Sequence, residues 1–552
     1  MYRDGKIWIA NTEKENGDPI CILPQMANRH GLVCGATGTG KTVTLKVLAE
    51  AFSDMGVPVF MADVKGDIAS MIRPGEDSEN MQERIRRFGL AEGGFSYRGY
   101  PVTLWDIFGK EGIQLRTTIT EIGPLLLARI LQLNDLQSDI LTIVFKIADD
   151  NGLLLIDTKD LKAILNYVDE NRNELAADYG KIAPASLGAI MRAVVALELE
   201  GGETFFGEPA LNIHDWLTRD PDGHGMINIL ASDSLINNGR LYSTFLLWLL
   251  SELFESLPEI GDPDRPRLVF FFDEAHLLFN GASKVLLDKI EQVVKLIRSK
   301  GVGVYFCTQN PRDIPDGVLA QLGNKIEHGL RAYTPAEQKS IKAAADSFRE
   351  NPSFDTAEAI KNLGTGEAVV SFLQEDGTPG MAQIAYILPP QSSLGTITDE
   401  ERARNIQNSL LYSKYAEAVD PDSAYEFLLR RGVEIAEQKA QEAIDALAAK
   451  EEELKAKEEA KQEAARLKEE AKQKAAEEKK AAQEAARLER EEERERERKA
   501  RVAKNAAKSV AGTLGREVGK TLGGSLGKTG KLLGGNLGAT LGRGILDTLF
   551  NR

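Results

Sequence analysis

The 552-residue sequence has few cysteines and no long apolar run. Its three cysteines, Cys21, Cys34 and Cys307, are too few and too scattered for a disulfide framework or a CxxC metal site. No uncharged apolar stretch of about 18 residues occurs, so we expect no transmembrane helix. The first residues, MYRDGKIWIANTEKENGD, lack the apolar segment of a signal peptide. We therefore expect a cytoplasmic protein with reduced thiols.

A surplus of positive charge is also missing. The net charge is −16, which argues against a uniformly basic nucleic-acid-binding protein but allows a local basic patch. The C-terminal segment is the exception, because residues 501–552 hold nine Lys or Arg and two acids, a local charge of +7. This asymmetry suggests that the segment has a partner of its own.

Composition divides the chain into five parts. We expect N-terminal strands in residues 1–34, an α/β domain in residues 35–390 with a mainly helical insertion at about 75–225, and a helical connector in residues 391–433. Residues 434–508 contain no Gly, Pro or aromatic residue and consist mostly of the strong helix formers Ala, Glu, Lys, Arg and Gln. Because leucines are sparse there, we predict a solvated single helix or a weak, Ala-rich coiled coil.

The basic tail, residues 509–552, repeats an aliphatic residue beside a glycine every four residues. Its two glycine rows are Gly515, Gly519, Gly523 and Gly527, then Gly530, Gly534, Gly538 and Gly542. Glycine costs a helix about 1 kcal/mol relative to Ala, so a disordered tail is one interpretation. Small residues four apart also let helices pack closely, and interspersed Lys and Arg suit an anionic membrane surface. We predict that residues 512–549 become helical on self-association, on a partner helix or at the membrane surface.

The strongest chemical signal is GATGTGKT, which fits the P-loop pattern G-x-x-x-x-G-K-[ST]. An apolar run, GLVC, precedes it, and the helical pattern KTVTLKVLAEAF overlaps its end. Backbone N–H groups of such a loop bind phosphate oxygens, Lys41 reaches the β- and γ-phosphates, and the Thr42 hydroxyl binds Mg²⁺. The predicted nucleotide-binding residues are Gly35, Ala36, Thr37, Gly38, Thr39, Gly40, Lys41 and Thr42. The predicted cofactors are ATP and Mg²⁺.

A second signal, RLVFFFDEAHLLF, supplies acids. Residues 268–272 form a continuous apolar run, as in a central parallel strand, and Asp273 and Glu274 follow it. Acids at the carboxyl end of such a strand face the ligand crevice. We expect Asp273 to bind Mg²⁺ and Glu274 to orient or deprotonate the attacking water.

Two further strand ends carry polar residues. GVGVYFCTQNP predicts a strand followed by Gln309, whose amide is suited to sense the γ-phosphate or position water, although a capping role is the alternative. VPVFMADVKGD predicts a strand ending at Asp63, for which a capping role and a catalytic role are equally compatible with the sequence.

With these pieces in order, the chain resembles the HerA-like branch of the HerA/FtsK P-loop ATPases. The matching segments, roughly within residues 20–390, are NRHGLVCGATGTGKT, DVKGD, FFFDEAH, IRSKGVGVYFCTQNP and NKIEHGLRA. The resemblance implies a RecA-like, mainly parallel sheet. It also implies a ring, usually hexameric, that moves DNA. It further implies Glu274 as catalytic base, Gln309 as sensor, Asp63 as an active-site acid, and an arginine finger acting on the neighbouring subunit's ATP. Arg298 matches that finger, and Arg331 is the second candidate.

The sequence leaves two classes of function open. The first is a Mg²⁺-dependent ATPase that works as a DNA translocase or helicase-like motor. The second is an ATP-driven remodelling or assembly ATPase that acts on a protein or membrane partner through its tail. No alternation of aromatic and basic residues marks a nucleic-acid groove. DNA as substrate is therefore implied by the resemblance alone.

Overall fold

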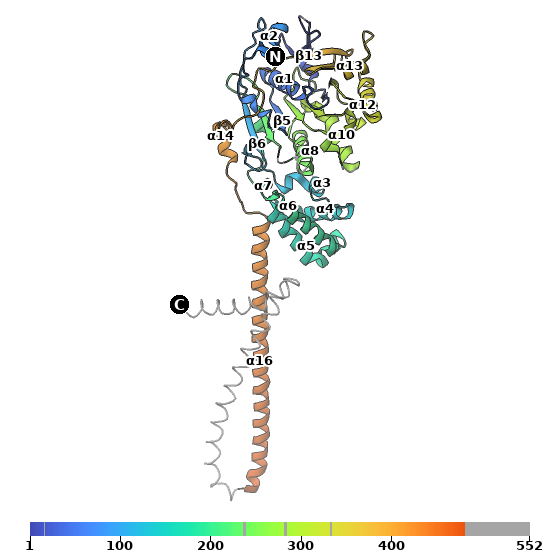
Figure 1. Ribbon diagram of the computed structural model, residues 1–552. Helices are drawn as coiled ribbons and strands as arrows, with labels where there is room; N and C mark the ends of the chain where they lie inside the picture. The colour runs from blue at the N-terminus through green and yellow to red at the C-terminus, as the bar shows by residue number, and fades with distance from the viewer. Residues whose placement is uncertain (16, 234, 236–238, 281–283, 332–333, 481–552) are drawn as a thin grey trace. The chain divides into compact units, whose positions relative to one another are not determined.

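The computed structural model describes residues 1–15, 17–233, 235, 239–280, 284–331 and 334–480 (Figure 1). These residues belong to two compact units. The first comprises Met1–Leu165 and Asn173–Ala424, and the second comprises Asn166–Arg172 and the chain from Tyr425 onward.

The first unit is built on a sheet that has 13 strands among the described residues, ordered β1-β2-β13-β12-β11-β4-β10-β9-β5-β8-β6-β7, with β3 paired to β2. The strands are β1 Tyr2–Arg3, β2 Lys6–Asn11, β3 Pro19–Ile22, β4 Gly31–Cys34, β5 Val59–Asp63, β6 Val102–Asp106, β7 Ile113–Gln114, β8 Ile227–Ala231, β9 Leu268–Phe272, β10 Val302–Thr308, β11 Asn324–His328, β12 Glu367–Ser371 and β13 Gln383–Ile387. From β11 to β7 the neighbouring strands are parallel, whereas β12, β13 and β1–β3 pair antiparallel.

The central strands are buried along their whole length. Every residue of β4, β5, β9 and β10 is buried, as expected where helices cover both faces of a parallel sheet. On one face Val269 and Phe271 share a core with Leu48 and Phe52 of the helix that follows β4. The alternate residues of β9, Phe270 and Phe272, are buried on the opposite face. The predicted α/β fold with a mainly parallel sheet is therefore confirmed.

The helices of the described chain lie between and after these strands, and five of them follow one another in the insertion. They are α1 Lys41–Asp54, α2 Glu79–Arg87, α3 Ile119–Ile130, α4 Asp135–Asp150, α5 Thr158–Tyr179, α6 Pro184–Leu199, α7 Gly202–Phe205, α8 Gly239–Ser256, α9 His276–Phe279, α10 Lys284–Ile297, α11 Asp316–Leu319, α12 Pro335–Asp346, α13 Thr356–Asn362, α14 Asp399–Asn408, α15 Tyr412–Tyr415 and α16 Ala424–Lys480. Within the insertion, α3 packs on α4 and α4 on α6, and Figure 1 shows these helices gathered together. The insertion also adds β6 and β7 to the sheet, two strands that the sequence analysis did not separate from it.

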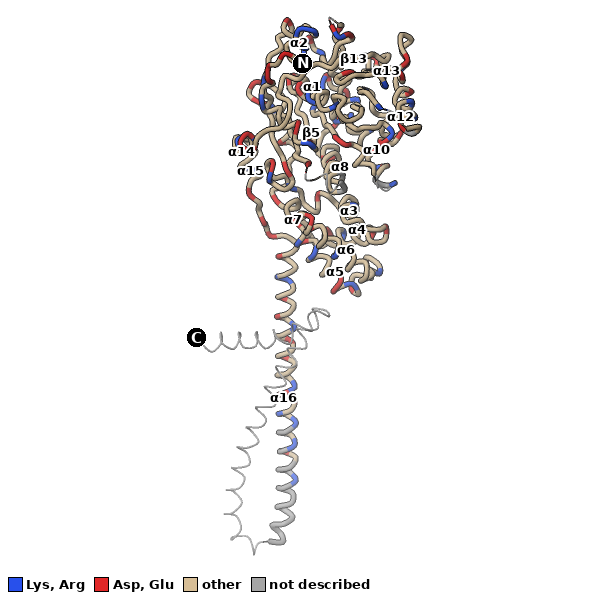
Figure 2. Tube along the Cα trace, viewed as in Figure 1, with Lys and Arg blue, Asp and Glu red and all other residues tan. Residues whose placement is uncertain are grey.

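The second unit contains most of α16, whose Lys, Arg, Asp and Glu residues are interspersed along the helix (Figure 2). The helix begins before the predicted residue 434, because residues 424–433 contain a single glycine, Gly432, and otherwise favour a helix. None of the helices in the described ranges is apolar over a stretch long enough to span a membrane. Residues 481–552, and with them the predicted glycine rows, lie outside the described part of the chain.

Candidate active site

The P-loop connects β4 to α1 and has the backbone that phosphate binding requires. Gly35, Gly38 and Gly40 have φ angles of 152°, 77° and 114°, which side chains disfavour. A Cβ on Gly35 would lie 2.5 Å from the Cβ of His328, so this position also has no room for a side chain. Lys41 Nζ donates hydrogen bonds to the carbonyl oxygens of Gly35, at 2.6 Å, and Ala36, at 3.0 Å. The ammonium group is thereby held at the mouth of the loop, beside the start of α1.

Two residues of β11 support the P-loop and the start of α1. His328 Nε2 lies 2.9 Å from Thr44 Oγ1 on α1, and His328 Nδ1 lies 2.9 Å from the carbonyl oxygen of Glu367. Glu327 is paired with Cys34 across the two strands, and the Cys34 thiol hydrogen-bonds to its carboxyl group. Burial raises the pKa of Glu327 to about 8. The sequence contained both residues in NKIEHGLRA but gave no signal for these supporting contacts.

The predicted acids and the sensor emerge beside the P-loop because their strands are neighbours. Phe306 of β10 is paired with Phe272 of β9, and Thr308 is paired with Cys34 of β4. All three strands are parallel, so Asp273, Gln309 and Gly35 follow them at the same edge of the sheet. The structure thus brings together the parts that the sequence predicted separately.

Asp273 and Glu274 occupy different environments. Asp273 Oδ1 accepts a hydrogen bond from the backbone N–H of Glu274 at 2.9 Å, and the Cys307 thiol also hydrogen-bonds to the Asp273 carboxyl group. Burial and the neighbouring Glu274 carboxylate raise the pKa of Asp273 to about 6. Glu274 has a φ angle of 48°, a left-handed conformation that is uncommon outside glycine and is frequent at functional sites.

Gln309 bridges the P-loop and Glu274. Its Oε1 accepts from Thr37 Oγ1 at 3.5 Å, and its Nε2 donates to Glu274 Oε1 at 3.5 Å. The other oxygen of Glu274, Oε2, is buried and has no hydrogen-bond partner in the described structure, although His276 Nδ1 lies 3.3 Å away. His276 is a member of this site that the sequence analysis did not single out. Its position three residues after Asp273 in FFFDEAH was the available signal.

The arrangement also fits a magnesium ion. Thr42 presents a hydroxyl group in the first turn of α1, and Asp273 presents a carboxyl group from the end of β9. Hydroxyl and carboxylate oxygens are the hard ligands that Mg²⁺ prefers, with water and phosphate oxygens completing its shell. A cation there would also stabilise the ionised form of the buried Asp273 carboxyl group.

Asp63 has the geometry of a cap. It is 2% exposed, and its carboxylate accepts hydrogen bonds from the backbone N–H groups of Gly66, Ile68 and Ala69 at 2.8, 3.0 and 2.9 Å. These bonds hold the loop that leads into the short 3₁₀ helix Ala69–Ile72. Of the two roles that the sequence left open, the contacts of Asp63 match capping.

The two candidate finger arginines lie at opposite ends of the parallel strands. Arg331 follows β11 and donates from Nη1 to the carbonyl oxygen of Lys361 at 3.2 Å. Arg298 precedes β10 and lies 3.7 Å from Asp262 Oδ1, with a side chain that is 41% exposed. Gln309 follows the other end of β10, so about 20 Å of strand separates Arg298 from the P-loop edge of its own chain.

A basic pocket surrounds Arg298. It has a volume of about 350 Å³, and Arg29, Lys295 and Lys325 line it together with Arg298 and no acidic side chain among the described residues. Arg29 Nη2 lies 3.4 Å from the same Asp262, and its buried Nε has no hydrogen-bond partner. The sequence gave no signal for this cluster, because its members come from three separate segments.

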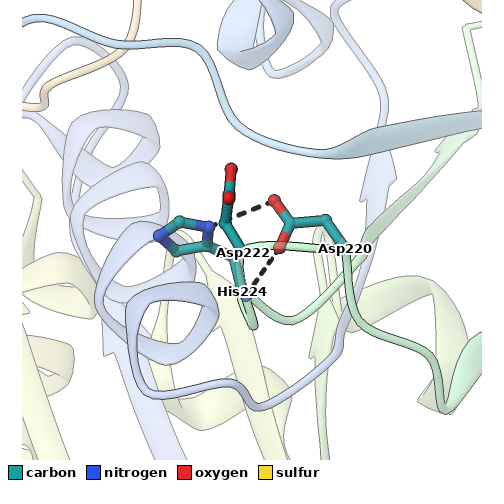
Figure 3. A group of neighbouring side chains, drawn as sticks. All are labelled: Asp220, Asp222 and His224. Carbon is teal, nitrogen blue, oxygen red and sulfur yellow. Dashed lines mark hydrogen bonds and ion pairs between the residues drawn. The ribbon is translucent and has the colours of Figure 1, made fainter.

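A group of possible metal ligands lies elsewhere, in the loop before β8. Side-chain atoms of Asp220, Asp222 and His224 lie within 4.8 Å of one another (Figure 3). However, His224 Nδ1 lies 3.1 Å from Asp220 Oδ2, and His224 Nε2 lies 3.1 Å from Arg98 Nη1. Both ring nitrogens are therefore engaged, one of them by a cation, and we assign no metal site here.

The parallel sheet, the loop between β4 and α1 and the acids at the end of β9 define a P-loop nucleoside triphosphatase. The family model described as Helicase HerA-like C-terminal matches residues 9–531, and the chain belongs to this family.

Two named relatives are similar over different lengths. The DNA double-strand break repair helicase HerA of Sulfolobus acidocaldarius is 20% identical over 378 residues, which are 67% of this chain and 66% of that protein. A probable helicase of Methanocaldococcus jannaschii, MJECL08, is 33% identical over 136 residues, 24% of each chain. The chain thus spans slightly less than two thirds of the length of the Sulfolobus relative.

Among solved structures, the bacterial conjugative coupling protein TrwB is similar with a TM-score of 0.47 and 17% identity, covering 72% of this chain and 90% of that one. The fold assignment rests on the sheet order and the loop geometry described above.

Proposed function

We propose that this chain is a Mg²⁺-dependent ATPase whose hydrolysis drives the movement of DNA. One observation carries the ATPase proposal: Gln309 connects the P-loop to Glu274 at the shared edge of three parallel strands. A nucleotide phosphate bound by the loop would lie beside a carboxylate that can accept a proton from water.

The residues have distinct roles in this proposal. Lys41 and the loop N–H groups bind the β- and γ-phosphates, and Thr42 with Asp273 would hold Mg²⁺, which would neutralise phosphate charge. Glu274 orients the attacking water and accepts its proton. Gln309 fixes the Glu274 side chain and senses the γ-phosphate. Asp63 keeps the adjoining loop in place.

We further propose that the site is completed by a second copy of the chain in a ring, in the hexameric arrangement implied by the resemblance. Arg298 is exposed at the amino-terminal end of β10, away from the P-loop of its own chain. This position suits an arginine that acts on a neighbour's nucleotide. The surrounding cations Arg29, Lys295 and Lys325 would attract the phosphate charge of that nucleotide. An arginine finger supplied in trans raises hydrolysis rates by about 10³–10⁵ in related systems.

DNA is proposed as the substrate because one relative is named as a DNA double-strand break repair helicase and the other as a probable helicase. The test is steady-state hydrolysis of MgATP by the full chain with and without double-stranded DNA. We expect basal hydrolysis and stimulation by DNA. Hydrolysis that DNA leaves unchanged would instead favour the second class of function, a remodelling or assembly ATPase.

A further inference from the structure

Helix α2, in the insertion, places three arginines near its C-terminal end, and their environments differ. Arg87 lies 3.7 Å from Glu83 and 3.9 Å from Glu15, whereas Arg86 is exposed to solvent. The Arg84 side chain is partly buried and has neither a hydrogen bond nor an ion pair in the described structure. Burial and the nearby Arg87 lower the pKa of Arg84, and no acid opposes them.

Arg84 is partly buried, and the described structure places no anion on its guanidinium group. The chain has 84 acidic residues against 68 basic ones, so a partner was available in principle. The acids beside two neighbours of Arg84, namely Glu367 next to Gly366 and Glu15 next to Arg87, are engaged elsewhere. Glu367 lies 2.9 Å from Lys14 and accepts from the backbone N–H of Gly364, while Glu15 lies beside Arg87. The charge of Arg84 thus remains without an anion.

The guanidinium group of Arg84 lies next to the P-loop, with Gly366 between them. A Cβ on Gly366 would be 2.9 Å from Arg84 Nη2, and a Cβ on Gly40 would be 3.2 Å from the Gly366 nitrogen. Gly366 also donates its backbone N–H to the carbonyl oxygen of Thr39 at 3.0 Å. With standard bond lengths these contacts place Nη2 within about 10 Å of the Gly40 Cα.

The sheet order shows which end of a bound nucleotide Arg84 would meet. Glu274 and Gln309 follow β9 and β10, on one side of β4. Gly366 precedes β12, which lies on the other side of β4, beyond β11. The hydrolytic groups, and therefore the γ-phosphate, lie on the side of β4 that carries β10 and β9. A cation on the other side of β4 faces the nucleoside end of the nucleotide.

We propose that Arg84 is a nucleotide-binding residue that holds the α-phosphate at the nucleoside end of the bound nucleotide, within its own chain. This inference rests on the proposed ATPase function and adds a contact from the insertion, outside the P-loop and the strand ends. An arginine hydrogen bond to a phosphate oxygen is charge-assisted and strong. The nucleotide would supply the anion that the apo protein does not provide to this side chain.

The test compares the full-length Arg84→Gln variant with the wild type by calorimetric titration with MgADP. We expect affinity to fall about 10-fold to 100-fold, as for loss of a charged hydrogen bond. Arg86→Gln, two residues along the same helix, is the matched control and should bind like the wild type. Arg84→Lys keeps the charge and should recover part of the lost affinity.

Two further measurements separate binding from a structural role. The KM for MgATP should rise in Arg84→Gln by the same factor, while kcat at saturating MgATP stays near the wild-type value, because Arg84 lies away from the hydrolytic groups. The apo variant should melt no lower than the wild type, since it loses a partly buried, unpaired charge. A lower melting temperature, or unchanged MgADP affinity, would overturn the assignment.

The Lys41→Ala variant distinguishes failure of this inference from failure of the proposed function. If the wild type binds no MgADP, both proposals fail. If the wild type binds MgADP and Lys41→Ala weakens binding while Arg84→Gln does not, the nucleotide site stands and only the role of Arg84 is wrong. Binding of inorganic tripolyphosphate should weaken in Arg84→Gln together with that of MgADP, because tripolyphosphate also presents a phosphate at the α position. Unchanged tripolyphosphate binding with weaker MgADP binding would place the contact on the nucleoside and overturn the assignment to the α-phosphate.

Discussion

Gln309 Nε2 lies 3.5 Å from Glu274 Oε1, at the point where two neighbouring parallel strands end. The same Gln309 side chain accepts from Thr37 of the P-loop. One amide thus connects the loop that would bind phosphate to the carboxylate that would accept a proton.

Glu274→Gln should retain MgATP binding and lose turnover. The amide keeps the shape of the side chain but cannot accept a proton from water, and general-base catalysis typically contributes about 10²–10⁴ in rate. Nucleotide affinity and steady-state hydrolysis, measured on the same preparation, check this. Turnover within a few-fold of the wild type would remove Glu274 from the role of base.

Gln309→Ala should lower kcat more than it changes the KM for MgATP, because the amide positions Glu274 rather than binding the nucleotide tightly. If it acts through Glu274, the Gln309→Ala/Glu274→Gln double variant should be little worse than Glu274→Gln alone. The four kcat values form a double-mutant cycle. Independent, additive losses would contradict a shared role.

Arg298→Ala should abolish most hydrolysis while leaving MgADP affinity unchanged. The reason is that Arg298 lies at the end of the parallel strands opposite to the P-loop of its own chain. Mixing this variant with Glu274→Gln should recover activity, because some interfaces then combine an intact Arg298 with an intact Glu274. The measurement is specific activity across mixing ratios. Activity equal to the sum of the separate variants would argue against a shared site.

Glu327→Gln should change how stability depends on pH. The pKa of Glu327 is about 8 in the folded protein and about 4.3 when unfolded, so the native state binds more protons between these values. The contribution of Glu327 to the free energy of unfolding of the wild type is therefore fully present below about pH 4.3, and it is lost as pH rises to about 8. The neutral variant lacks this loss, so its melting temperature relative to wild type should increase from pH 5 to pH 8.5, by the equivalent of a few kcal/mol at most.

Measuring both proteins without nucleotide, in the same buffers, cancels the contributions of the other groups. A difference in melting temperature that is constant from pH 5 to pH 8.5 would show that Glu327 does not titrate in this range.

The basic tail is predicted to bind an anionic surface. The full chain should associate with vesicles that contain acidic lipids, and a chain ending at residue 508 should not. The reason is that residues 501–552 carry a local charge of +7, and most of this positive charge lies beyond residue 508. Co-sedimentation with acidic and with neutral vesicles checks this. Equal binding of the two chains to acidic vesicles would leave the tail without this role.

The P-loop, the apolar strand with its two acids, and the Gln-bearing strand were predictable because each is a local pattern. A phosphate-binding turn needs glycines at fixed positions, and a central parallel strand needs an uninterrupted apolar run. The α/β fold class followed from the same patterns. The strands β6 and β7 were not separated from the insertion, because a short apolar run does not by itself distinguish a strand from a buried helical turn.

The sequence by itself determined the chemistry of the site: a lysine, a hydroxyl, two acids and an amide, each at the end of a strand or the start of a helix. Only the tertiary structure decided which of them meet and what else surrounds them. Strand order placed Gln309 between Thr37 and Glu274, and set Arg298 at the opposite end of the parallel strands. It also brought Arg84, from a helix remote in sequence, beside Gly366. Such long-range contacts depend on how strands and helices assemble, which local residue patterns do not specify.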